Sequence, residues 1–303
     1  MSGASRGSRI ALGVFTALLM LFLFFPIAII IVYAFNPSNI QSWPLPGLST
    51  RWFSPTWHNA EMRHALWLSV RAGLFSTAIA VVLGSMAAFA VHRFRFFGRE
   101  AVSFLIVLPI ALPGIITGMA LNSFISFGGV EFGLLTIIVG HATFCIVTVY
   151  NNVLARLRRT PSSLIEASMD LGADGWQTFR FVTLPTIATA LVAGALLAFA
   201  LSFDEIVVTT FTAGAQSTLP IWIFGNIRLG QQLPQVNVVV LFVILLSLIP
   251  VALAQRLTRD TGVLRGAGGR GPAPAVPASG AGAGAIAAPG GGAASAVGAG
   301  AVP

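Results

Sequence analysis

The sequence predicts an all-α membrane protein that crosses a lipid bilayer six times. Of its 303 residues, 56% are hydrophobic and only 9% are charged, and the mean hydropathy is +0.87. Soluble globular proteins carry about 25% charged residues, so this composition excludes a soluble domain. The apolar residues also form long runs with arginines at their ends. Such runs favour helices, because a helix satisfies its own backbone hydrogen bonds inside lipid.

Six stretches are long enough to span a bilayer core, which requires roughly 20 apolar residues in a helix. They are Ile10–Phe35, Leu66–Val91, Ala101–Phe127, Phe132–Leu154, Leu184–Phe211 and Val236–Ala254. The first stretch is uncharged and lacks a small-x-small cleavage site, so we interpret it as an uncleaved signal anchor. Pro109 and Pro113 predict a kink in the third stretch. Gly84 and Ala88, four residues apart in the second, predict a close helix contact.

The arginines predict the orientation of these spans. All 17 basic residues are arginines. With the amino terminus inside, only Arg51, Arg63, Arg71 and Arg228 fall in outer segments. Because cytoplasmic loops carry the excess of basic residues, both termini are expected to be cytoplasmic. Arginines placed at the ends of apolar runs mark membrane topology, so a nucleic-acid partner is not expected.

The chain divides into three parts by composition. Residues 1–64 are expected to hold the first helix and an outer loop. Residues 65–257 are expected to form a five-helix core that includes the cytoplasmic loop 155–183. Residues 258–303 are expected to be a cytoplasmic tail. From residue 266 onward the tail is rich in Gly, Ala and Pro, and with so little apolar bulk it is predicted to be disordered.

The inner loop 155–183 predicts two short helices rather than a polar linker. Ser163 and Glu166 have the spacing of a capping box, and Thr160-Pro161 offers a second possible helix start. Gly172 is expected to close the first helix in the left-handed conformation, and Asp174 to cap a second turn. Leucine, isoleucine, methionine and tryptophan side chains would be exposed on this loop. They predict a docking surface for another protein.

The same loop resembles the EAA loop of inner-membrane permeases of ABC importers, whose pattern is EAA-x3-G-x9-I-x-LP. The matching residues are Glu166, Ala167, Ser168, Gly172, Val182, Leu184 and Pro185. Ser168 replaces the second alanine of the pattern and Val182 its isoleucine. The resemblance implies that the loop is the coupling helix that sits in a cleft of the ATP-binding subunit. It implies this contact for Glu166, Ala167, Ser168, Asp170, Gly172, Leu184 and Pro185. The alternative is a loop that packs on its own bundle.

The resemblance extends from Ala65 to Leu257 and is to spermidine/putrescine-type permeases of the PotC and YdcV kind. It rests on the runs Leu108–Gly114, Gly140–Phe144 and Ala200–Glu205. It implies a type I ABC-importer permease core (MetI-like) in a bacterial cytoplasmic membrane. The implied partners are two copies of an ATP-binding subunit, a sister permease subunit and an extracytoplasmic solute-binding protein. ATP and Mg²⁺ would belong to the ATP-binding subunit, because a chain without lysine has no P-loop lysine.

Several residues within the spans are candidates for the substrate path: Asp204, Glu205, His141, Phe203 and Trp222. Carboxylates inside a membrane are costly, so they are expected to face water, a partner or the cargo. Neighbouring helical residues diverge by about 100°, so Asp204 and Glu205 cannot both face one path. One is expected to serve a cation while the other pairs with an arginine or caps backbone. A gate or an interhelical hydrogen bond is the alternative. For His141 we weigh a path residue against a neutral imidazole bonded to a neighbouring helix.

These observations predict a permease subunit for a small solute, with putrescine or spermidine as the leading cargo. The alternatives are another solute, namely 2-aminoethylphosphonate, thiamine or iron, or an ion-coupled secondary carrier. A secondary carrier usually has repeated halves with broken helices, and no long internal repeat appears. An intramembrane metalloprotease is excluded by the absence of H-E-x-x-H. Cys145 is a lone cysteine and the histidines are scattered, so no disulfide, metal site or catalytic residue is expected.

Overall fold

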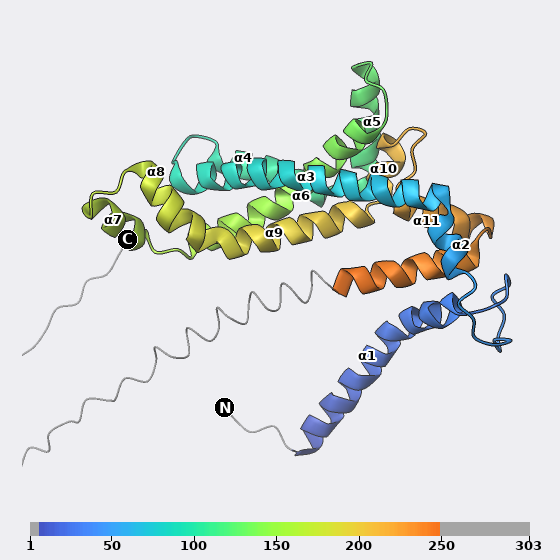
Figure 1. Ribbon diagram of the computed structural model, residues 1–303. Helices are drawn as coiled ribbons and strands as arrows, with labels where there is room; N and C mark the ends of the chain where they lie inside the picture. The colour runs from blue at the N-terminus through green and yellow to red at the C-terminus, as the bar shows by residue number, and fades with distance from the viewer. Residues whose placement is uncertain (1–5, 249–303) are drawn as a thin grey trace, which may run out of the picture. The chain divides into compact units, whose positions relative to one another are not determined.

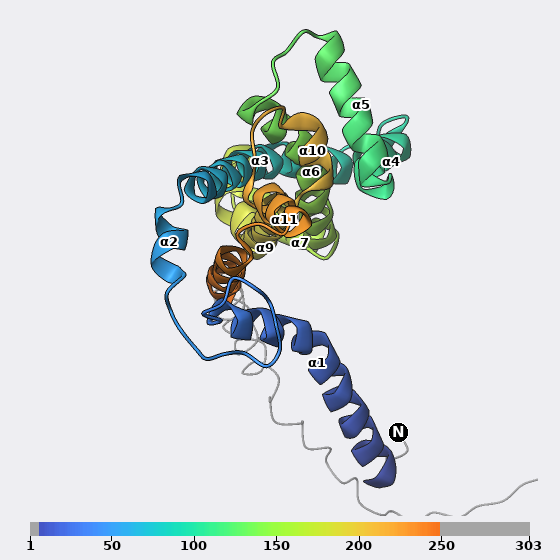
Figure 2. The ribbon, with the colours of Figure 1, turned by 90° about the vertical axis from the view of Figure 1, so that its right-hand side faces the viewer.

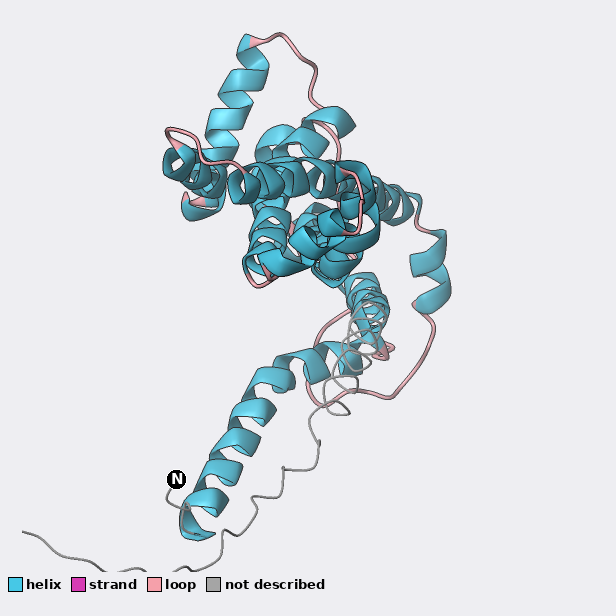
Figure 3. Cartoon of the chain, turned by 90° about the vertical axis from the view of Figure 1, so that its left-hand side faces the viewer, coloured by secondary structure: helices cyan, strands magenta, loops and turns pink. Residues whose placement is uncertain are grey.

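The computed structural model describes residues 6–248, and all regular secondary structure in this range is helical (Figures 1 and 3). The helices are α1 (Arg6–Ala34), α2 (Phe53–His58), α3 (Ala60–Arg93), α4 (Arg99–Ala111), α5 (Gly114–Phe127), α6 (Leu134–Arg158), α7 (Ser162–Asp170), α8 (Gly175–Thr178), α9 (Leu184–Asp204), α10 (Val207–Thr212) and α11 (Leu219–Leu229). A π-helical turn, Phe179–Thr183, joins α8 to α9, and a further helix covers Leu233–Leu248. The expectation of an all-α protein is confirmed.

Four helical segments of the described range are long and apolar enough to cross a membrane. They are Gly7–Ala34, Ala60–Arg93, Leu134–Arg158 and the continuous segment Gly175–Asp204. The bent pair α4 and α5 adds a fifth if it is counted as one span. The sixth predicted span corresponds to the helix Leu233–Leu248, and its remainder up to Ala254 lies outside the described residues. Both termini and the tail 258–303 also lie outside them.

The third predicted span is broken rather than kinked. Helices α4 and α5 meet at an angle of 104° (Figure 2), so the expectation of one helix over Ala101–Phe127 is wrong. The break is at Pro113, which has no backbone N–H and forces Leu112 before it into an extended conformation (φ −81°, ψ 146°). Pro109, in contrast, lies inside α4. The second of the two prolines therefore ends the helix.

The core forms where α3, α6 and α9 pack along one another (Figure 1). The predicted close contact at Gly84 and Ala88 is confirmed, because both are buried and Gly84 lies against the backbone of α6. A Cβ atom at Gly84 would be 2.8 Å from the carbonyl oxygen of Ile146. A Cβ atom at Gly194 of α9 would likewise be 3.3 Å from the Cα atom of Val149 in α6. Both neighbours thus reach α6 without an intervening side chain.

Helix α1 leaves most of its apolar surface exposed within the described chain. None of the residues in its most hydrophobic stretch is buried against the rest of the described chain. Contact with the other helices is made at its carboxyl end, where Ala34 packs with Val238 and Leu241. The indole N–H of Trp52 also donates to the backbone oxygen of Asn36 (3.1 Å), which fixes the chain that follows α1. An apolar helix of this length is suited to lipid or to a partner helix.

Helix α11 lies in the connection between the fifth and sixth predicted spans, which carries Arg228 and was therefore expected on the outer side. Pro220 stands in its first turn, and Gly230 ends it in the left-handed conformation (φ 64°). The Ser69 hydroxyl of α3 accepts a hydrogen bond from the backbone N–H of Leu219 (2.8 Å), which ties this helix to the core. Proline and glycine thus mark the two ends of a short helix in the connection between the fifth and sixth predicted spans.

We predict that Gly84→Ala destabilises the protein by about 1–3 kcal/mol, because the added methyl group must displace the backbone of α6. Gly225→Ala in α11 is the matched control, since a Cβ atom there would meet nothing within 4 Å. The control should preserve or raise stability, because alanine favours helix over glycine. Thermal midpoints of the purified variants in detergent provide the measurement. Equal midpoints for the two variants would contradict the close packing of α3 on α6.

Candidate functional site

The predicted site residues lie in two regions that are separated by the length of α9 (Figure 1). The EAA-like loop precedes α9, and the acidic pair Asp204-Glu205 stands at its carboxyl end. At 1.5 Å per residue, Asp204 is about 28 Å from Pro185 along the helix. The loop and the acidic pair are therefore different parts of one continuous element.

The first helix of the loop, α7, begins directly after Pro161, and no side chain caps its first turn. The predicted capping box of Ser163 and Glu166 is therefore wrong, and the alternative start at Thr160-Pro161 is the one observed. Proline suits the residue directly before a helix, because its fixed φ (−63° here) is compatible with an extended N-cap and it has no N–H that needs a partner. With Pro161 as the N-cap residue, Ser163 is inside the helix and Glu166 is left free of any capping role.

The end of α7 has the predicted left-handed glycine. Gly172 has φ +86°, and its N–H donates to the backbone oxygen of Met169 (2.9 Å). The N–H of Ala173 donates to the backbone oxygen of Ser168 (3.1 Å), which completes a Schellman motif. A Cβ atom at Gly172 would meet nothing within 4 Å. Backbone conformation alone, and not crowding, therefore favours glycine here.

The second helix of the loop, α8, is fixed by polar contacts. The Asp174 carboxylate accepts from the N–H of Gln177 (2.7 Å), and the Gln177 side chain accepts from the N–H of Asp174 (2.9 Å). The cap predicted for Asp174 is thus confirmed. The hydroxyls of Ser168 and Thr178 lie 3.0 Å apart and join α7 to α8. An alanine could not make this bond, so the departure of Ser168 from the EAA pattern has a local structural role.

The side of this loop that faces away from the helix bundle is exposed, and we name it the coupling surface. It comprises Leu164, Glu166, Ala167, Met169, Asp170, Leu171 and Trp176. No residue of α7 is buried, and Leu171 is 90% exposed. Leu184 and Pro185 follow in the first turn of α9, where both are exposed. Large apolar side chains and two acids at the surface of a short helix suit contact with another protein.

The fifth predicted span, Leu184–Phe211, is interrupted at the acidic pair. Helix α9 ends at Asp204, Glu205 is extended (φ −74°, ψ 118°), and α10 begins at Val207. The Glu205 carboxylate accepts a hydrogen bond from the N–H of Val208 (2.9 Å) in the first turn of α10. Of the alternatives expected for the pair, the backbone cap is the one observed for Glu205.

Asp204 differs from Glu205 in its surroundings. Its side chain is exposed, and within residues 6–248 it has no hydrogen-bond or ion-pair partner. It stands at the carboxyl end of α9, where the helix dipole adds further negative potential. At the break, Glu205 thus caps the backbone of α10, whereas the Asp204 carboxylate remains available for a cation.

His141 bridges the break from α6. It is 1% exposed, with Nδ1 2.7 Å from the Ser202 hydroxyl of α9 and Nε2 2.8 Å from the Thr209 hydroxyl of α10. The Thr209 hydroxyl donates to the backbone oxygen of Glu205 (2.6 Å) and so accepts from Nε2–H. Nδ1 accepts from or donates to the Ser202 hydroxyl, according to the protonation of the ring. The interpretation as an imidazole bonded to a neighbouring helix is confirmed, and its bonds join both sides of the break.

The carboxyl end of α10 is satisfied by side chains of two other helices. Asn122 of α5 donates from Nδ2 to the backbone oxygen of Phe211 (2.6 Å). Thr136 of α6 donates to the backbone oxygen of Thr212 (2.7 Å). Sequence reasoning missed Asn122, Thr136, Ser202 and Thr209. An asparagine within an apolar stretch was the available signal, since polar side chains in spans commonly bond to neighbouring helices.

The aromatic path candidates are partly or wholly covered. Phe203 is half-buried, with its ring centroid 5.9 Å from that of Phe199. Trp222 is 6% exposed and packs with Met62 and Leu219, so its ring is not open to a path in this conformation. Within residues 6–248 no cluster of three or more His, Cys, Asp or Glu side chains is arranged to hold a metal ion.

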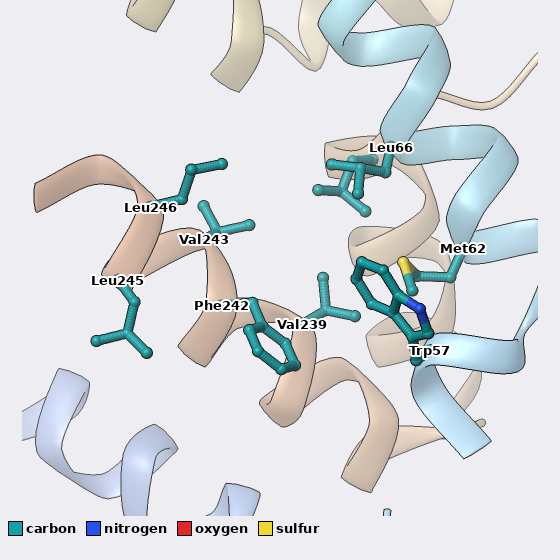
Figure 4. Close-up of a pocket in the computed structure, with 9 residues that line it drawn as sticks. Trp57, Met62, Leu66, Val239, Phe242, Val243, Leu245 and Leu246 are labelled. Atoms are coloured by element: carbon teal, nitrogen blue, oxygen red, sulfur yellow. The ribbon is translucent and has the colours of Figure 1, made fainter. Parts of the chain in front are cut away.

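An apolar pocket of about 400 Å³ lies between α3 and the helix Leu233–Leu248 (Figure 4). Its walls are formed by Trp57, Met62, Leu66, Val239, Phe242 and neighbouring aliphatic side chains. These walls offer no charged group to a ligand. The pocket therefore has a different chemical character from the surroundings of Asp204.

Comparison with known proteins identifies a transport family. The profile of the family described as "Binding-protein-dependent transport system inner membrane component" matches residues 80–263. The spermidine/putrescine transport system permease protein PotC of Escherichia coli (strain K12) is 32% identical over 254 residues, which cover 83% of this chain and 95% of PotC. The putrescine transport system permease protein PotI of the same strain is 36% identical over 225 residues, covering 71% and 79%.

Solved structures share the fold. A chain of a bacterial ABC transporter involved in the import of the acidic polysaccharide alginate has a TM-score of 0.58 at 19% identity, covering 86% of this chain and 99% of its own. A chain of the MetNI methionine ABC transporter has a TM-score of 0.53 at 21% identity, covering 66% and 94%. At these identities the likeness concerns the fold alone, and it confirms the expected MetI-like permease fold.

We predict that His141→Leu loosens the break between α9 and α10. It removes two interhelical hydrogen bonds, each worth about 0.6 kcal/mol in membrane proteins. Hydrogen–deuterium exchange of the amides of residues 205–212 should become several-fold faster, while exchange in α3 stays unchanged. Thr143→Ala is the control, because the Thr143 hydroxyl bonds within its own helix, to the backbone oxygen of Gly140. Unchanged exchange at residues 205–212 would show that His141 does not hold the break.

Proposed function

This chain belongs to the family of binding-protein-dependent transport system inner membrane components, and we propose that it forms the translocation path for a polyamine such as putrescine or spermidine. As a permease of this family it is a transport subunit, and ATP hydrolysis belongs to a separate subunit. It is a multi-pass protein of the bacterial inner membrane.

The observation that carries the proposed cargo is the exposed, unpaired carboxylate of Asp204. An ammonium group that has lost part of its water gains a charge-assisted hydrogen bond from such a carboxylate. A phosphonate would be repelled there, which disfavours 2-aminoethylphosphonate. Thiamine and iron are cations and remain alternatives that competition experiments distinguish. The similarity to the polyamine permeases PotC and PotI supports the choice of a polyamine.

We propose that the coupling surface docks into a cleft of an ATP-binding subunit. Its exposed leucines, its tryptophan and the acids Glu166 and Asp170 provide an apolar contact with a charged rim. Two copies of that subunit would supply ATP and Mg²⁺, and a sister permease would complete the path. A solute-binding protein would deliver the cargo from outside. The likeness to a chain of an alginate transporter in complex with a periplasmic protein supports a partner of this kind.

The connection between the two regions suggests how the partner acts on the path. Residues Gly175–Asp204 form one continuous helical segment of 30 residues. Its first part is anchored to α3, because the ring centroid of Phe179 is 5.5 Å from that of Phe89. A displacement of the loop by the ATP-binding subunit would therefore be passed to the start of α9 and, through the contact of Phe179 with Phe89, to α3. The opposite end of the same segment carries Asp204.

We predict that Gly172→Ala impairs coupling while Gly175→Ala does not. A Cβ atom at either position would meet nothing within 4 Å, but only Gly172 has a positive φ. Alanine at Gly172 should cost about 1 kcal/mol and distort the end of α7. Uptake, and stimulation of ATPase activity by loaded binding protein, should fall several-fold although the protein still inserts. Normal coupling in Gly172→Ala would argue against this loop as the contact.

We predict that Asp204→Asn lowers uptake of radiolabelled putrescine at least tenfold without changing thermal stability. Glu205→Gln should have a smaller effect on uptake, because an amide oxygen can still accept from Val208 N–H. Glu205→Ala, which loses the cap, should instead destabilise the protein by about 1 kcal/mol. The measurement is uptake in cells expressing the full complex, with thiamine, ferric iron and 2-aminoethylphosphonate as competitors. Efficient transport of an anion without competition from putrescine or spermidine would refute a polyamine cargo and leave the family assignment standing.

A further inference from the structure

A polar cavity of about 970 Å³ lies between the turn that joins α3 to α4 and the carboxyl end of α6. Arginines from two segments far apart in sequence meet in it: Arg95 from the turn, Arg99 from the first residue of α4, and Arg158 from the end of α6. We name this the arginine cavity. None of its lining residues belongs to the acidic pair or to the coupling surface, although Arg158 is close in sequence to the start of α7.

The arginine cavity has an excess of positive charge that the chain does not neutralise. Three guanidinium groups face it and one carboxylate, that of Glu100. Within residues 6–248 none of the three guanidinium groups has a side-chain hydrogen bond or an ion pair. Arginines without a counter-charge in one cavity repel one another, and an anion placed between them relieves that repulsion. The cavity is thus complementary to a phosphate group.

The amino end of α4 adds to this potential. Gly98 adopts φ +82° and turns the chain so that the 13-residue helix begins at the wall of the cavity. Helix amino termini carry partial positive charge and favour anions. Ser103 lies one turn further along α4, and its hydroxyl is 2.8 Å from that of the buried Tyr150. This bond holds α4 against α6 and so keeps the two sets of arginines together.

The surroundings of the arginine cavity indicate a lipid rather than a free anion. Phe94, Phe96 and Phe97 alternate with the arginines on the α3–α4 turn, and all three are exposed, Phe97 completely. Exposed phenylalanines beside two apolar helices are suited to the boundary between headgroups and acyl chains. Both loops that supply the arginines are predicted on the inner side, where basic pockets between spans bind phospholipid headgroups.

We propose that the arginine cavity binds the phosphodiester headgroup of an anionic phospholipid of the inner leaflet. Arg95, Arg99 and Arg158 would contact the phosphate oxygens, with the phenylalanines of the turn beside the acyl chains. The bound lipid would join the α3–α4 turn to α6. This inference goes beyond the transport function and does not depend on which cargo is carried.

The test uses the complete importer complex, purified in detergent after reconstitution with phosphatidylglycerol. Retained phosphatidylglycerol is counted by mass spectrometry for the wild type, for R95Q/R99Q/R158Q and for each single variant. The triple variant should retain at least fivefold less lipid. Added phosphatidylglycerol should raise the thermal midpoint of the wild type but not of the triple variant. Arg159→Gln and Arg180→Gln are matched controls, because these exposed arginines do not line the cavity, and they should retain the wild-type amount.

Glu100→Gln provides a variant with the opposite expected sign. It removes the acid from the arginine cavity, so retention of phosphatidylglycerol should rise above that of the wild type. Equal retention in the triple variant and the wild type would overturn the proposal. Displacement of the lipid by millimolar inorganic phosphate would also overturn it, in favour of a free anion. Loss of the ATP-binding subunit from the triple variant with unchanged lipid would instead assign these arginines to a subunit contact.

Discussion

Lipid cannot satisfy a backbone polar group, and this constraint governs the place where the fifth predicted span is interrupted. Between α9 and α10 the freed groups are taken up by a chain of hydrogen bonds. One ring nitrogen of His141 is bonded to the Ser202 hydroxyl and the other to the Thr209 hydroxyl, and Thr209 donates to the backbone oxygen of Glu205. The Glu205 carboxylate serves the first turn of α10, and residues from α5 and α6 serve its last. A helix of six residues is stable here because other elements complete its hydrogen bonding.

Close packing makes these polar contacts possible. Hydrogen bonds between helices require backbones that approach one another, and the glycines of α3 and α9 permit that approach to α6. Helix α6 is consequently the most buried of the long helices, and it carries both His141 and Thr136. Gly140, next to His141, lies against Val208 and Thr212 of α10. The helix that centres the bundle is therefore also the helix that supports the break.

Features encoded by neighbouring residues could be predicted from the sequence, whereas pairings across the chain could not. The long apolar runs, the left-handed Gly172 and the cap at Asp174 depend on residues within a few positions of one another. Two local signals competed at the start of α7, and nothing in the sequence ranked the proline above the capping box. Two prolines likewise marked the third span without showing which one ends the helix. His141 bonds to residues 61 and 68 positions away, and the spacing of residue types along the sequence does not indicate such distant partners.

The single helical segment from Gly175 to Asp204 fixes the angle about the helix axis between the EAA-like loop and the Asp204 side chain. Each residue of an α-helix advances the chain by 1.5 Å and turns it by about 100°. Inserting or deleting one residue within α9 would therefore rotate Asp204 by more than a quarter turn relative to the loop, while shifting it by less than the length of a hydrogen bond. Substitutions in α9 alter packing locally, but a change of length alters which way the acid faces. The spacing between Pro185 and Asp204 thus sets the direction of the acid relative to the loop, independently of the residues that fill it.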